Sequence, residues 1–137
     1  MFDDGTQGLR MNFYPPCVLA NKFMGLTPHS DATGLTLLVQ MNNVKGLQIR
    51  KNGKWVPVNP IPSAFIINIG NIIEHRAVVN PEKQRLSIGA FHGPHIKAMI
   101  CPLPDLVKET KVNYKTISHE DYIRLLLKSK LDGKSQI

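Results

Sequence analysis

Short apolar runs, several of them alternating with polar residues, divide most of the chain into segments typical of β-strands. Residues typical of turns separate these segments, and Asn52-Gly53 is the dipeptide most typical of a tight β-hairpin. The run at 64–69 is almost continuously apolar, which predicts a fully buried strand. The complete set of predicted strands covers residues 8–14, 24–29, 34–40, 46–50, 54–58, 64–69, 76–79, 85–91 and 96–100.

The end of the chain has a helical pattern instead. Ser118 followed by Asp121 is a capping pattern, and the apolar positions from Tyr122 to Leu131 form a helical stripe that Gly133 would end. Many short strands with one late helix predict a mainly β fold, a jelly roll with a C-terminal α-helix. We expect a single domain over residues 1–137, with its core at about 7–101 and the tail and helix at about 102–133.

Composition narrows the class of protein. The 137 residues are 42% hydrophobic, enough for one small core. The net charge of +7 is compatible with a protein that binds nucleic acid. The basic residues are scattered without interleaved aromatics, however, so no nucleic-acid partner is expected. Cys17 and Cys101 lack a pairing context and are expected to be reduced. No apolar run approaches the roughly 18 residues of a membrane span, and no signal peptide is visible, which predicts a cytoplasmic protein without membrane contact. We also expect a monomer.

Two histidines and an aspartate are candidate metal ligands. His29 and Asp31 are two positions apart, so on a strand they point to the same side, and His75 follows downstream. Two imidazoles and one carboxylate on one face of an ion leave the opposite positions open, which suits a non-haem Fe(II) centre. A His-x-Asp pair also recurs by chance, so spacing alone leaves open that these are three unrelated polar residues. The remaining histidines are expected at the surface: His92, His95 and His119.

Two further pairs are candidate contacts for a bound acid. Arg85 and Ser87 share one side of a predicted strand and could hold a carboxylate together; the alternative is an exposed arginine beside a small polar residue. Asn12 and Tyr14 also share a side, and the Tyr14 hydroxyl would add a hydrogen bond. The alternative for this pair is an ordinary strand that leads into the Pro15-Pro16 turn.

Taken in order, these residues resemble a known family, the plant 2-oxoglutarate/Fe(II)-dependent dioxygenases of the isopenicillin-N-synthase-like superfamily, senescence-related type. The resemblance is to the C-terminal catalytic part and covers nearly the whole chain. The motifs that carry it are NFYPPC at 12–17, GLTPHSD at 25–31, GLT at 34–36, GLQI at 46–49, GKWV at 53–56, NIG at 68–70, HR at 75–76 and RLS at 85–87.

The resemblance implies a double-stranded β-helix in which His29, Asp31 and His75 bind Fe(2+). It implies that Arg85 and Ser87, assisted by Asn12 and Tyr14, bind the co-substrate 2-oxoglutarate, with ascorbate as a candidate reductant. The implied activity is an oxidoreductase of plant secondary metabolism. With dioxygen, such an enzyme hydroxylates, demethylates or desaturates a small molecule.

The chain departs from the family pattern in two places. It starts where family members are already about halfway through, and His75 follows Asp31 after only 44 positions, fewer than in the family. We therefore expect either a degraded iron site or a His75 that reaches it only by distorting the strand before it. Three alternatives stay open: an inactive truncated or mis-spliced product, an iron/ascorbate oxidase that does not use 2-oxoglutarate, and a basic binding module.

Overall fold

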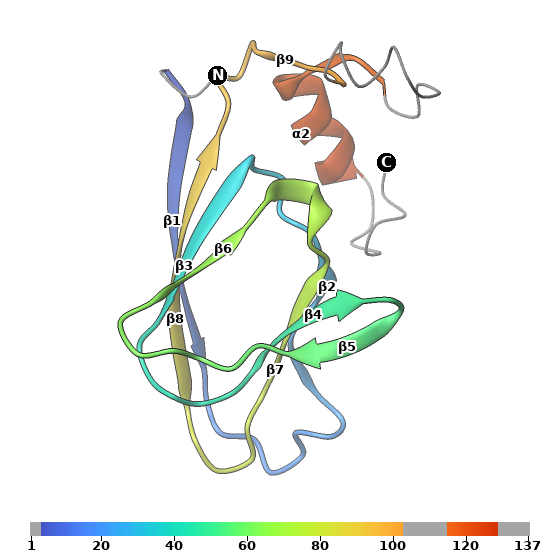
Figure 1. Cartoon of the computed structure of the whole chain (residues 1–137). Coiled ribbons are helices and arrows are strands. Elements are labelled where there is room, and N and C mark those ends of the chain that lie inside the picture. The colour runs from blue at the N-terminus through green and yellow to red at the C-terminus, as the bar shows by residue number, and fades with distance from the viewer. Residues whose placement is uncertain (1–3, 103–114, 129–137) are drawn as a thin grey trace.

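Two four-stranded antiparallel sheets face each other in the computed structural model, which describes residues 4–102 and 115–128 (Figure 1). The major sheet has the order β1 (Thr6–Tyr14), β8 (Arg85–Gly93), β3 (Leu35–Gln40) and β6 (Phe65–Asn68). The minor sheet has the order β2 (Met24–His29), β7 (His75–Val78), β4 (Leu47–Lys51) and β5 (Lys54–Pro57). The predicted mainly β, jelly-roll fold is confirmed.

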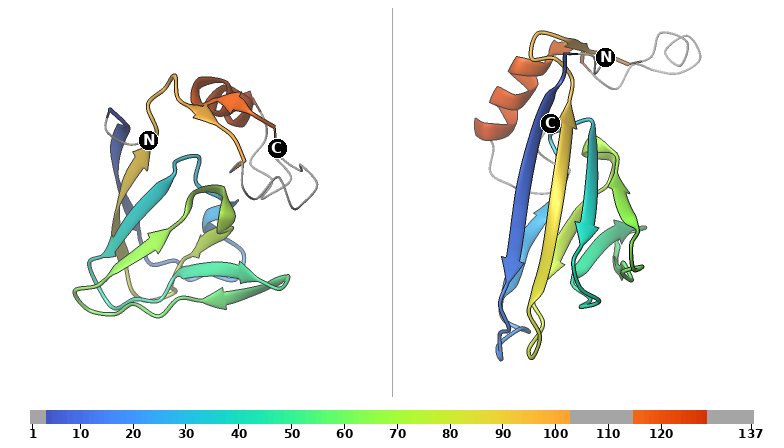
Figure 2. Two further views of the ribbon diagram at one scale, coloured as in Figure 1. Left: turned by 45° about the horizontal axis from the view of Figure 1, so that its top comes forward. Right: turned by 90° about the vertical axis from the view of Figure 1, so that its left-hand side faces the viewer.

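The remaining elements lie at one end of the sheets (Figure 2). Strands β9 (Met99–Ile100) and β10 (Ile117–Ser118) pair with each other, and α2 (His119–Lys128) follows directly. The Ser118 hydroxyl accepts a hydrogen bond from the backbone N–H of Asp121 at 3.1 Å, which confirms the predicted cap. The predicted end of the helix, at Leu131 and Gly133, lies outside the described residues.

The hairpin between β4 and β5 forms where the sequence predicts it. Asn52 and Gly53 have φ values of 49° and 76°, the left-handed conformation that a two-residue turn of this kind requires. The turn fixes the register of the two strands, with Lys51 opposite Lys54 and Arg50 opposite Trp55. The register is relevant to the site because Arg50 contacts Glu74, the residue before His75.

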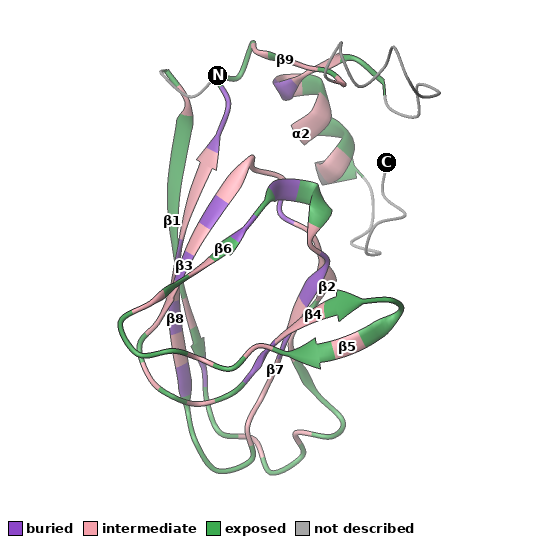
Figure 3. Ribbon diagram, viewed as in Figure 1, coloured by how far each residue is buried: buried purple, intermediate pink, exposed green. Residues whose placement is uncertain are grey.

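Burial alternates along β3 and β8 of the major sheet, as Figure 3 shows. On β8, Arg85 and Ser87 point between the sheets and are 2% and 1% exposed. The prediction of a fully buried strand at 64–69 is wrong, because Phe65 and Ile67 are 64% and 55% exposed and only Asn68 is buried. They lie on the outer face of the sheet, which the described residues do not cover.

The expectation of a surface position is also wrong for His119. Its side chain is only 2% exposed, at the start of α2, and a Cβ atom at Gly93 would lie 3.1 Å from its ring. The sequence does not reveal this contact because it joins the helix to the distant end of β8. His95 is exposed and His92 is half-buried.

Two smaller findings complete the fold. Cys17 and Cys101 are free, as expected. Within the described parts of the chain, no helix has the length and apolar character needed to cross a membrane.

Candidate metal centre

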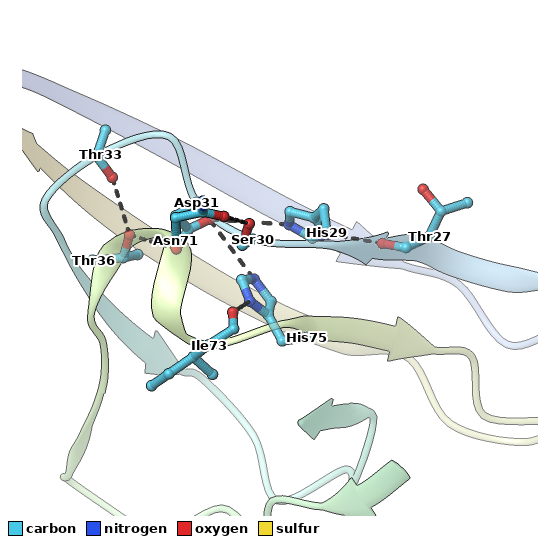
Figure 4. A network of polar contacts seen from close by, with 9 residues as sticks. All are labelled: Thr27, His29, Ser30, Asp31, Thr33, Thr36, Asn71, Ile73 and His75. Atoms are coloured by element: carbon cyan, nitrogen blue, oxygen red, sulfur yellow. Dashed lines mark hydrogen bonds and ion pairs between the residues drawn. The ribbon is translucent and has the colours of Figure 1, made fainter. Parts of the chain in front are cut away.

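Strand pairing brings the three candidate ligands together. His29 ends β2 and lies opposite His75, the first residue of β7, and Asp31 follows in the loop after β2 (Figure 4). The two imidazole rings have their centroids 4.3 Å apart. One ligand atom from each of the three residues lies within 4.8 Å of the other two. Residues up to 46 positions apart thus form one compact donor set.

Hydrogen bonds to the backbone orient both imidazoles. The Nδ1 atom of His29 lies 2.8 Å from the carbonyl oxygen of Thr27, and that of His75 lies 3.1 Å from the carbonyl oxygen of Ile73. A carbonyl oxygen only accepts, so in each ring Nδ1 carries the proton and the neutral ring keeps a lone pair on Nε2. The two Nε2 atoms lie 4.0 and 3.7 Å from Oδ1 of Asp31. Metal-binding histidines are commonly held in this way, with one ring N–H bonded to a carbonyl oxygen and the other nitrogen facing the metal.

Asp31 is fixed by the opposite sheet. Its side chain is buried, and its Oδ2 accepts a hydrogen bond of 2.6 Å from the hydroxyl of Thr36 on β3. The other oxygen, Oδ1, is left to face the two histidines. Thr36 was not predicted as a site residue, although it belongs to the GLT motif and shares one side of β3 with Leu38 and Gln40.

The environment of His29 favours its neutral form. Burial is the main cause that lowers the pKa of His29, and the neighbouring His75 lowers it further. The Thr27 carbonyl and Asp31 act in the opposite direction, but the net pKa stays below the ordinary value. A neutral imidazole is the form that binds a metal ion.

A buried arginine lies in the same cavity. The Nε of Arg85 donates to Oε1 of Gln40 at 3.0 Å, and its Nη1 donates to the hydroxyl of Ser87 at 3.4 Å. Its guanidinium lies 5.3 Å from the ring centre of Tyr14. No carboxylate of the described residues lies within ion-pair distance of it. Burial lowers the pKa of Arg85 because a buried charge is poorly solvated, and the side chain of Tyr14 acts in the opposite direction.

All seven residues singled out from the sequence line one cavity between the sheets: Asn12, Tyr14, His29, Asp31, His75, Arg85 and Ser87. The β1–β8 register places Tyr14 opposite Arg85 and Asn12 opposite Ser87. The cavity is also lined by Arg10 and Phe91, which sequence reasoning missed. Both could have been found by parity, because they share the inward side of their strands with Asn12 and Arg85.

The geometry agrees with comparisons to known proteins. A family model described as the 2OG-Fe(II) oxygenase superfamily matches residues 5–94, more than half of the chain. The chain belongs to this superfamily.

Plant members of the superfamily match nearly the whole chain. The 2-oxoglutarate-dependent dioxygenase 11 of Oryza sativa subsp. japonica is 47% identical, over 100% of this chain and 42% of its own length. Codeine O-demethylase of Papaver somniferum is 47% identical, over 98% and 41%. The crystal structure of JOX2 in complex with 2OG, Fe and JA has a TM-score of 0.89 and 35% identity, over 98% of this chain and 43% of that chain. The chain therefore spans about two-fifths of the length of these oxygenases.

The alignment lengths agree with residues missing inside this chain relative to the family pattern. The alignment with the rice dioxygenase spans 148 residues, eleven more than the 137 of the chain. In the structure, a short 3₁₀ helix, η1 (Gly70–Ile72), connects β6 to the residues before His75. Gly70 has a φ of 38°, and a Cβ atom there would lie 2.8 Å from the carbonyl oxygen of Thr33, so this tight turn favours glycine.

The short connection still places His75 opposite His29 and beside Asp31, which argues against the expected degraded ligand geometry; iron binding by the set stays a prediction. The hydroxyl of Ser30, between His29 and Asp31, donates a hydrogen bond to the side chain of Asn71 in η1. The expected irregularity lies elsewhere, since the β2–β7 register shifts twice between Met24 and His29. On the other side, β7 pairs regularly with β4.

Proposed function

We propose that this chain forms the catalytic core of an Fe(II)- and 2-oxoglutarate-dependent oxygenase. Its reaction would be hydroxylation, demethylation or desaturation of a small plant metabolite. One observation carries the proposal: the Nε2 atoms of His29 and His75 and Oδ1 of Asp31 converge in the cavity that holds a buried guanidinium, which has no acidic partner among the described residues. A single domain, a monomeric state, a cytoplasmic location and the lack of a nucleic-acid partner remain predictions from the sequence.

The donor set fits Fe(II). Two neutral imidazoles and one carboxylate on one side of an ion leave its other positions free for the co-substrate and dioxygen. Bound iron supplies the activation of dioxygen, coupled to oxidative decarboxylation of 2-oxoglutarate to succinate. The chain contributes ligand orientation through the carbonyls of Thr27 and Ile73 and through the hydroxyl of Thr36.

The other end of the cavity fits the distal carboxylate of 2-oxoglutarate. The buried Arg85 guanidinium would gain the anion that it lacks, and the Ser87 hydroxyl would donate a second hydrogen bond. Asn12 and Tyr14 lie opposite this pair on β1 and would add amide and phenol contacts. The keto acid end would then face His29, Asp31 and His75. Arg85 and Ser87 would thus orient the co-substrate toward the metal.

Turnover tests this proposal. The chain is incubated with Fe(II), ascorbate and dioxygen, and succinate release is measured with and without 2-oxoglutarate. We expect metal-dependent succinate release that Asp31→Ala and His75→Ala abolish and that the exposed His95→Gln, a matched histidine control, leaves unchanged. Equal release from the wild type and Asp31→Ala would overturn the proposal. Oxidation that persists without 2-oxoglutarate would instead favour an iron/ascorbate oxidase.

A further inference from the structure

A buried carboxylate lies next to a candidate metal ligand without contacting the metal centre. Glu74 immediately precedes His75 and is only 5% exposed. Both of its carboxylate oxygens accept hydrogen bonds from Nη1 of Arg50, at 3.2 and 3.1 Å. Arg50 is on β4, and its side chain is 48% exposed. One half-exposed cation therefore holds one buried anion at the position before His75.

The residue after His75 is held by the same strand. The Nε of Arg76 donates to Oε1 of Gln48 on β4 at 2.7 Å, and its guanidinium lies 4.3 Å from the ring centre of Trp55. The backbone adds a third tie, since the N–H of Arg50 donates to the carbonyl oxygen of Glu74 at 2.8 Å. Both sequence neighbours of His75 are thus bound to β4.

These ties lie on the regular side of β7. Gln48 pairs with Arg76 and Ile49 pairs with His75 without interruption, whereas the pairing of β7 with β2 is irregular. The connection that leads to His75 is also short, because only Ile73 and Glu74 separate η1 from it. The position of His75 therefore depends on its attachment to β4 more than on the segment before it.

We propose that Glu74 is a positioning residue that acts through Arg50. The pair holds the start of β7 on β4, so that the His75 imidazole faces Asp31 and completes the metal site. This inference rests on the proposed function, because it concerns the affinity of that site for its metal. It assigns no contact between Glu74 and the metal or the co-substrate.

The test measures Co(II) binding to the metal-free chain by titration, together with the visible spectrum of bound Co(II) and the Tm of the metal-free chain. Loss of a group that orients a metal ligand typically weakens binding by about 10- to 100-fold. We expect Glu74→Gln to weaken Co(II) binding by roughly tenfold or more and to change the spectrum. Arg50→Gln should have the same effect, and the double variant should be no worse than either single one because the pair acts as a unit.

A matched control is the exposed ion pair of α2, between Arg124 and Glu120 at 2.6 Å. Glu120→Gln makes the same chemical change and should leave Co(II) affinity and spectrum unchanged. Arg50→Lys keeps the charge and should retain most of the affinity.

The outcomes separate the two proposals. If the wild type binds Co(II) no better than His75→Ala, the metal site itself is refuted. If the wild type binds Co(II) and Glu74→Gln binds with the same affinity and spectrum, the metal site stands and the positioning role is overturned. If Glu74→Gln does not fold, Arg50→Gln decides, since its side chain is half exposed: weakened binding supports the inference and unchanged binding overturns it.

Discussion

Replacing Arg85 with glutamine should separate co-substrate binding from stability. Arg85 is 2% exposed, and its guanidinium is held by the amide oxygen of Gln40 and the hydroxyl of Ser87, with no carboxylate of the described residues beside it. A buried charge without a counter-ion costs several kcal/mol of desolvation, which a bound dicarboxylate would offset. The variant should therefore bind 2-oxoglutarate weakly while its metal-free fold is about as stable as the wild type.

The size of the effect follows from the contacts. A hydrogen bond to a charged group contributes about 1.5–3 kcal/mol. A loss of about 2.7 kcal/mol corresponds to a roughly 100-fold higher Kd. For stability, the glutamine removes the desolvated charge but also loses the hydrogen bonds that the guanidinium donates to Gln40 and Ser87, worth about 1.5–3 kcal/mol each. The two contributions nearly cancel.

Thermal unfolding measures both quantities: without metal it gives the stability of the fold, and with Co(II) under anaerobic conditions it gives the binding of 2-oxoglutarate. At a 2-oxoglutarate concentration of 100 times the wild-type Kd, the wild type gains about 2.7 kcal/mol, and a variant with a 100-fold higher Kd gains only about 0.4 kcal/mol. At roughly 4 °C per kcal/mol for a chain of this size, the shifts are about 10 °C and below 2 °C. Pyruvate, which lacks the distal carboxylate, should bind both proteins equally.

Two results would refute this reasoning. One is a variant that still prefers 2-oxoglutarate to pyruvate as strongly as the wild type, which would place the carboxylate elsewhere. The other is a metal-free variant whose Tm falls by many degrees, which would make Arg85 a structural residue. Arg124→Gln on α2 is the control for loss of an arginine charge.

Three further predictions follow from other contacts. Thr36→Val removes the hydroxyl that fixes Asp31 and should weaken Co(II) binding by about 10- to 100-fold, whereas Thr36→Ser should retain it; equal titrations for all three proteins would contradict this role. Because the folded-state pKa of His29 lies below about 6.5, the unfolded chain takes up the proton first, so metal-free stability should fall as pH drops below about 6.5. His29→Gln should flatten this fall in urea unfolding between about pH 5 and 8, and an unchanged slope would exclude His29 as its source. Gly53→Ala should lower unfolding free energy by about 1 kcal/mol in urea melts because of its positive φ, while Gly8→Ala should not; equal effects would contradict the strained turn.

Local patterns were sufficient to predict most of the elements, although they missed η1 and β10 and predicted a longer β9. The Asn52-Gly53 turn fixes a hairpin by backbone conformation alone, and β2 begins and ends at the predicted residues 24–29. Burial was less predictable, because Phe65 and Ile67 have the composition of a buried strand but lie on an uncovered sheet face. Hydrophobicity indicates which residues gain from burial, and tertiary structure decides whether they are covered.

In the candidate site, too, the sequence predicts which residues take part but not how they are held. The motifs and strand parity identified residues that line one cavity, including His29 and Arg85. The contacts that hold them join distant segments and left no local signal: Thr36 reaches Asp31 from the opposite sheet, and Arg50 reaches Glu74 across 24 positions. The number of residues before His75 could not show that a 3₁₀ turn lets this short connection reach the site.

Anaerobic equilibrium dialysis of the chain with Fe(II) and 2-oxoglutarate tests the central claim most directly. His29, Asp31, His75 and Arg85 should form one site, so we expect one Fe(II) per chain and one 2-oxoglutarate that binds only when the metal is present. Asp31→Ala should bind neither. If Asp31→Ala bound as much Fe(II) as the wild type, or if 2-oxoglutarate bound equally without metal, the proposed site would be contradicted.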